Sequence, residues 1–175
     1  MIVFLMIFVF AYISAVVESQ WAVNVNLIGG VALLSYMLFG LRLIPSVLLA
    51  IIVASLIFKP QGAIVPLELA MMTFTCTVAP AIALYIMSSA KRINISSIVS
   101  ITFKQVLILS FLQAIFCSIF KLAQLATTTE HTLPIAMAES FSSFFVIDFI
   151  GTATLVYVAI QIIIYSKKIK LTQFS

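Results

Sequence analysis

The side chains best suited to chemistry in this sequence are polar groups set within long apolar runs. Gln113, Lys121 and Gln124 share one such run with Lys104. At about 100° per residue in a helix, Gln113, Lys121 and Gln124 fall within an arc of about 80°, with Cys117 between them. Lys104 falls on the opposite side of that helix. One helix face therefore offers an ammonium and two amides, which can hold a carboxylate or a small polar molecule.

Carboxylates that could meet this face come from other apolar runs, where Glu68, Glu139 and Asp148 lie. Ionisable groups at membrane depth usually face the protein interior or a hydrated cavity and find a partner. We therefore predict that Lys121 lies near Asp148 or Glu68, in a ligand-binding pocket open to the external side. Its candidate residues are Trp21, Asn24, Asn26, Glu68, Gln113, Lys121, Gln124, Glu139 and Asp148. The alternative is that these groups only snorkel and hold helices together.

No catalytic constellation is present in the sequence. The one histidine, His131, has no nucleophile or metal-ligand pattern beside it. Gly29-Gly30 lacks the Lys-Ser/Thr and the strand-to-helix context of a phosphate-binding loop. Cys76 and Cys117 fall within apolar runs and lack the spacing of a metal site. We expect a protein that is not an enzyme and that uses no metal or cofactor.

The composition indicates that these residues are positioned inside a lipid bilayer. Hydrophobic residues make up 64% of the chain and charged residues 8%, against about 25% charged residues in an ordinary soluble domain. So few charges cannot cover a globular surface. The net charge of +4 does not indicate nucleic-acid binding, because the basic residues sit between apolar runs instead of forming a stripe.

The apolar runs predict an all-α integral membrane protein, a single domain over residues 1–175. A spanning helix needs about 20 mostly apolar residues, and the runs are too long and continuous for barrel strands. The six predicted helices cover residues 2–17, 22–39, 43–58, 66–87, 97–125 and 135–165. Pro45 falls in the first turn of its helix, where it is tolerated, whereas Pro80 should kink the fourth helix.

The positive-inside rule gives the orientation. With the N-terminus in the cytoplasm, Lys59 is the only basic residue in an external loop, while Glu18 and Glu130 are also external. The cytoplasmic ends then carry Arg42, Lys91, Arg92, Lys167, Lys168 and Lys170. This distribution predicts a bacterial inner-membrane protein with both termini in the cytoplasm.

The sixth run is about 46 Å long as a helix, which exceeds the hydrocarbon thickness of about 30 Å. Either the helix tilts, or its first third, residues 135–144, lies along the external interface before the span begins. We favour the second arrangement, which places Asp148 close to the external boundary.

Two segments resemble the bacterial membrane-associated sensor domains of the MASE type. Trp21 precedes a glycine-led apolar helix over residues 27–34, and residues 39–45 read Phe-Gly-Leu-Arg-Leu-Ile-Pro. Residues 144–152, Phe-Phe-Val-Ile-Asp-Phe-Ile-Gly-Thr, are similar to the family's closing element. The resemblance extends over residues 21–165. The chain departs from the family in having Ala22-Val23 where prolines are expected and fewer spans than the family's eight or so.

The resemblance implies a polytopic sensory module that works with a histidine kinase or a cyclic-dinucleotide cyclase. We expect a stand-alone module without a soluble output domain, which responds to an external or membrane-borne ligand and acts through a partner protein. Two alternatives remain open. One is the substrate-binding subunit of a vitamin-type importer, which would fit Ala11 and Ala15 on the first helix. The other is an accessory subunit of a membrane complex.

Overall fold

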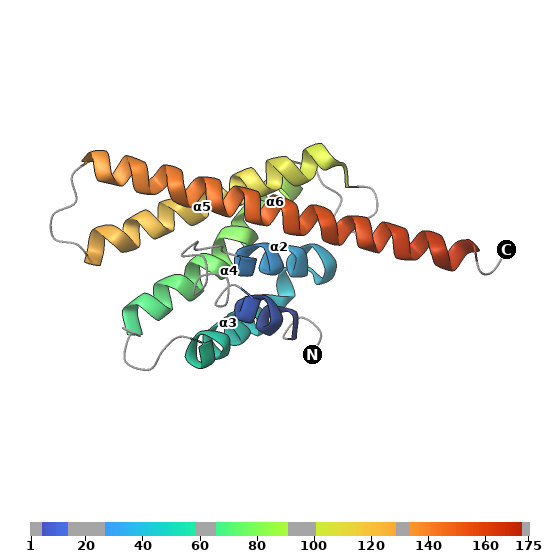
Figure 1. Cartoon of the computed structure of the whole chain (residues 1–175), viewed down its shortest axis with the longest axis horizontal. Coiled ribbons are helices and arrows are strands. Elements are labelled where there is room, and N and C mark those ends of the chain that lie inside the picture. Colours follow the sequence, from blue (N-terminus) through green and yellow to red (C-terminus); the bar gives the residue numbers. More distant parts are fainter. Residues whose placement is uncertain (1–4, 14–26, 59–65, 91–100, 129–133, 173–175) are drawn as a thin grey trace.

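The computed structural model describes residues 5–13, 27–58, 66–90, 101–128 and 134–172, and these contain helices and no strand. The predicted all-helical fold is confirmed for this part of the chain (Figure 1). Residues 5–13 are helical. They are followed by α2 (Leu27–Phe39), the short 3-10 helix η1 (Leu41–Leu43), α3 (Ile44–Phe58), α4 (Pro66–Ser89), α5 (Phe103–Thr128) and α6 (Pro134–Thr172).

Three of these helices are long and apolar enough to cross a membrane. Their apolar stretches are Leu69–Ser89 of α4, Phe103–Ala126 of α5 and Met137–Ser166 of α6. As described, α2 has 13 residues and α3 has 15, which gives lengths of only about 20 and 22 Å. Much of the first predicted helix and the start of the second lie outside the described residues. By length and composition, three helices in the described part of the chain could therefore cross a membrane, which supports a membrane protein.

Large apolar side chains are exposed on the outside of the bundle. Leu49, Tyr85, Ile150 and Ile162 are each more than half exposed. A monomeric soluble protein rarely exposes extended apolar patches, whereas a surface of this kind is solvated by lipid. The interior also contains a cluster of apolar side chains. Its buried core includes Leu33, Tyr36, Val47, Ala50, Leu84, Leu109 and Val156.

The helices from α3 to α6 alternate in direction. Figure 1 shows the start of α3, the end of α4, the start of α5 and the end of α6 toward one side of the molecule. The end of α3, the start of α4, the end of α5 and the start of α6 lie toward the other. The closest packing joins α5 to α6, with α2 and α4 also packed against them.

A glycine makes the turn between α2 and α3. Gly40 has a φ of 82°, a left-handed backbone conformation that side chains other than glycine rarely adopt. Its N–H donates a hydrogen bond of 2.8 Å to the Tyr36 carbonyl, and the Leu43 N–H donates one of 3.3 Å to the Gly40 carbonyl. The predicted position of Pro45 in the first turn of its helix is confirmed.

Helix α5 begins later than predicted. Thr102 is not helical, and its N–H donates to the Gln105 side-chain oxygen at 2.8 Å. In return, the Gln105 N–H donates to the Thr102 hydroxyl at 3.4 Å. This reciprocal pair is a capping box. The predicted start at residue 97 was wrong for positions 101 and 102, since the Thr-x-x-Gln spacing that marks the true start was missed.

Helix α6 runs without a break from Pro134 to Thr172. The favoured arrangement, in which residues 135–144 form a separate interfacial segment, was wrong. The serines of this segment do not break the helix; Ser142, for example, donates to the Ala138 carbonyl within it. The 39 residues of α6 extend over about 58 Å. In Figure 1 its C-terminal end projects past the other helices. One continuous helix therefore covers the residues that were expected to form a separate segment and a span.

Candidate functional site

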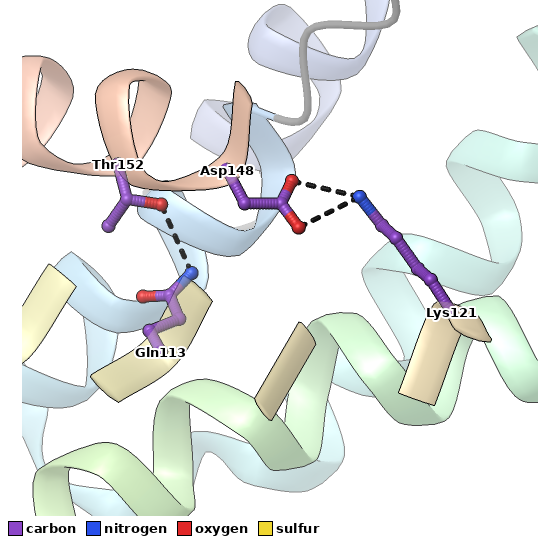
Figure 2. Close-up of polar contacts among 4 residues, drawn as sticks. All are labelled: Gln113, Lys121, Asp148 and Thr152. Carbon is purple, nitrogen blue, oxygen red and sulfur yellow. Dashed lines mark hydrogen bonds and ion pairs between the residues drawn. The ribbon is translucent and has the colours of Figure 1, made fainter. Parts of the chain in front are cut away.

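Two polar contacts join α5 to α6 in the interior of the bundle (Figure 2). The first is a hydrogen bond of 3.2 Å from the Gln113 amide nitrogen to the Thr152 hydroxyl. Both side chains are buried. A hydrogen bond between side chains is favoured in an apolar interior, where an unpaired amide is costly. This contact fixes the register of the two helices near their midpoints.

The second contact is an ion pair. The Lys121 ammonium nitrogen lies 2.8 Å from one Asp148 carboxylate oxygen and 2.9 Å from the other. Asp148 is 1% exposed and Lys121 is 23% exposed. The ammonium also lies 5.4 Å from the centre of the Phe144 ring, within the range of a cation–π interaction. The carboxylate is thus enclosed, and the lysine reaches it from a more open position.

Helical spacing explains why these residues meet. Gln113, Cys117 and Lys121 recur every four residues on α5, so they form one row along the helix. Asp148 and Thr152 form a similar row on α6. Gln113 contacts Thr152, and Lys121, two turns further along α5, contacts Asp148, one turn before Thr152 on α6. This pairing follows because the two helices are antiparallel. We call these five residues the α5–α6 polar seam.

Three buried polar atoms on α5 have no hydrogen-bond partner within the described part of the chain. They are the hydroxyl oxygens of Ser110 and Ser118 and the side-chain oxygen of Gln113. Other hydroxyls in the bundle bond to a carbonyl one turn earlier, such as Thr73 to Leu69 and Thr77 to Thr73. Ser110 and Ser118, with the buried Ala114 between them, form a row of small residues. Such a row lets helices approach closely.

A further polar contact joins α2 to α4. The Tyr36 hydroxyl donates a hydrogen bond of 3.2 Å to the Thr77 carbonyl. Thr77 lies three residues before Pro80, which is inside the helix and cannot donate to the Cys76 carbonyl. The Tyr36 hydroxyl therefore bonds the backbone in the turn that Pro80 disturbs. Sequence reasoning did not select Tyr36, although a tyrosine in the middle of an apolar helix is a usable signal.

Helix α2 also lies very close to α6. A Cβ atom added to Gly30 would lie 3.3 Å from the Cα of Thr152 and 3.6 Å from the Cβ of Leu155. The 3.3 Å distance is tighter than most Cβ contacts, so a side chain at this position would need its neighbour to move by a few tenths of an ångström. Thr152 is therefore held between Gln113 of α5 and the backbone of α2, and the polar seam is packed on a third helix.

Six of the predicted site residues are not among the five that define the seam, and only Gln124 and Glu139 of these six have described side chains. Trp21, Asn24 and Asn26 lie outside the described residues. Glu68 is in the first turn of α4, outside the part of the chain whose side chains are described. Gln124 is half-buried on α5, one turn beyond Lys121, and Glu139 is exposed on α6. Of the nine predicted residues, the structure thus groups Gln113, Lys121 and Asp148.

The seam has the groups for an ion pair and for binding a polar ligand, but not for holding a metal. No cluster of three or more His, Cys, Asp or Glu side chains occurs among the residues described. Cys76 and Cys117 are free thiols and buried. Comparison with protein-family models, with curated proteins and with solved structures gives no match for the chain.

Proposed function

We propose that this chain is a non-catalytic sensor module of the bacterial inner membrane, which binds an external or membrane-borne ligand and acts through a partner protein. The observation that carries the proposal is the Lys121–Asp148 ion pair between α5 and α6. Charged residues within membrane helices are costly and are characteristic of functional sites. A pair used only to hold helices together could be replaced by apolar packing of similar volume at little cost.

The pair is suited to switching because it joins two separate helices. A ligand that binds Asp148 or Lys121 must break or share the ion pair, and this changes the free energy of the α5–α6 contact. The ligand can shift the packing only by its difference in affinity for the two arrangements. We propose that α6 transmits this shift, because its C-terminal end extends past the rest of the bundle.

The proposed topology has six spans with both termini in the cytoplasm. The alternation of α3, α4, α5 and α6 supports it, since the helix ends adjoining Arg42, Lys91, Arg92 and the lysines near position 170 lie toward one side. The proposed sensor function is supported by the likeness of residues 144–152 to the closing element of MASE-type domains, because that segment contains Asp148. A sensor of this type would act on a kinase or a cyclase.

Purification from native membranes tests the proposal. The tagged wild-type chain is cross-linked in the membrane, solubilised in mild detergent, and its copurifying proteins are identified. We expect a kinase or cyclase whose activity changes in the Asp148→Asn variant but not in Lys104→Met, which removes an exposed lysine from the opposite face of α5. Copurification with an ATPase and an energy-coupling membrane subunit would instead establish the importer reading. An Asp148→Asn variant that behaves like the wild type would remove the seam from the mechanism.

A further inference from the structure

The Lys121 ammonium occupies a site with recognisable chemistry. It lies within hydrogen-bond distance of both Asp148 oxygens, at 2.8 and 2.9 Å, and 5.4 Å from the centre of the Phe144 ring. A carboxylate with an aromatic ring beside it is a favourable environment for any primary ammonium group. Phe144 and Asp148 are one turn apart on α6, so one helix supplies both groups. Lys121, in contrast, comes from α5.

The two partners differ in their freedom to leave. Asp148 has a short side chain and is 1% exposed, whereas Lys121 is 23% exposed. Lys121 is also seven residues from the end of α5 at Thr128, a distance of about 10 Å along the helix. A lysine with a long apolar stem can extend from such a position toward the polar boundary. Lys121 is therefore the exchangeable partner and Asp148 the fixed one.

We infer that Asp148 and Phe144 form a recognition site for the primary ammonium group of a small-molecule amine, with Lys121 as its intramolecular competitor. The inference rests on the proposed function, because it names the ligand class of the same seam. An anionic ligand fits less well, since on approaching Lys121 it would meet the fixed Asp148 carboxylate. An amine entering the site displaces Lys121 and replaces its contacts with equivalent ones, while the released lysine moves outward.

Competition by a tethered group has a measurable consequence. Lys121 is attached to the same molecule, so its effective concentration at Asp148 is in the millimolar range or above. A free amine must overcome this competitor in the wild type but not in Lys121→Ala. The amine that replaces the atoms removed by this substitution beyond Cβ is propylammonium. We expect propylammonium to bind at least tenfold more tightly to Lys121→Ala than to the wild type.

The experiment measures the melting temperature of the purified full chain in detergent against propylammonium chloride, at fixed pH and ionic strength. Lys121→Ala should show a saturable rise in melting temperature with propylammonium but none with 1-propanol, which lacks the charge. Phe144→Leu in the Lys121→Ala background should weaken this binding severalfold. Lys121→Met should not respond, because its apolar side chain fills the space, and Lys121→Ala/Asp148→Asn should not respond, because the carboxylate is gone.

The inference is overturned if 1-propanol stabilises Lys121→Ala as well as propylammonium does, or if the response survives Asp148→Asn. It is also overturned if Lys121→Ala does not respond at all. Should Lys121→Ala fail to fold alone, the yield of monodisperse protein purified with propylammonium or with 1-propanol becomes the readout. No partner is needed here, so amine binding without partner coupling contradicts only the proposed function, while partner coupling without amine binding contradicts only this inference.

Discussion

At the level of single residues, the oppositely charged side chains of Lys121 and Asp148 contact each other between α5 and α6. Asp148 is enclosed, and Lys121 neutralises both of its oxygens. Removing either partner leaves the other without its counter-charge, which is far more costly than losing the pair together. A single substitution at Lys121 or Asp148 is therefore expected to lower the stability of the protein strongly.

A double-mutant cycle measures this coupling. We expect Asp148→Asn and Lys121→Met each to lower the free energy of unfolding by about 3 kcal/mol, somewhat less if the freed lysine reaches the polar boundary. The double variant should be more stable than the sum of the two changes predicts, with a coupling energy of about 1–3 kcal/mol. Unfolding in mixed micelles provides the measurement, and Lys104→Met, on an exposed position, serves as the matched control. Strict additivity would show that the charges do not interact.

The sequence could anticipate the Lys121–Asp148 contact because acidic residues are so few. With only Asp148 and Glu68 available at a suitable depth, helical periodicity left two candidate partners for Lys121. The Tyr36–Thr77 contact could not be foreseen in this way. It depends on how α2 packs on α4, and the acceptor is a backbone carbonyl that is present at every residue. Glu139 lies on the same helix as Asp148 but is exposed, because it falls on a different face.

At the scale of the element, the helices are held at close distance by small residues. Gly30 of α2 meets the backbone of α6 at Thr152, and the row of Ser110, Ala114 and Ser118 on α5 is fully buried. In lipid, helices associate through van der Waals contacts and hydrogen bonds. Small residues at helix crossings therefore favour association more than large apolar residues do.

Enlarging Gly30 tests the α2–α6 crossing. Gly30→Leu should separate the helices and lower the melting temperature strongly, because its side chain would run into Thr152 and Leu155. In Gly30→Ala the improved helix propensity of about 1 kcal/mol opposes a tight contact of 3.3 Å, so we expect a small net change. Leu38→Met, on an exposed position of the same helix, is the control. A fully stable Gly30→Leu protein would contradict the close crossing.

Helix boundaries show why some elements were predicted better than others. Pro66 marks the start of α4 in both the sequence and the structure, since proline is favoured in the first turn of a helix. The start of α5 depends on the weaker Thr102–Gln105 capping signal, which apolar periodicity does not register. The continuity of α6 was missed because its serines and Glu139 looked like an interfacial segment, although all of these residues are compatible with a helix.

For the whole molecule, the exposed apolar side chains require a bilayer around the helices. The three long helices meet the requirement of length and composition. The proposed arrangement of six spans adds that basic residues gather on the cytoplasmic side. Arg42 and Lys170 would then face the cytoplasm, while Glu130, between α5 and α6, would face the outside.

Cysteine labelling in intact cells tests this arrangement most directly. Single cysteines replace Arg42, Glu130 or Lys170, and each variant is exposed to a membrane-impermeant maleimide before and after permeabilisation. The native Cys76 and Cys117 are buried, and the wild-type chain measures any background from them. We expect Glu130→Cys to be labelled in intact cells, and Arg42→Cys and Lys170→Cys to be labelled only after permeabilisation. Labelling of Arg42→Cys or Lys170→Cys from outside intact cells would contradict the account.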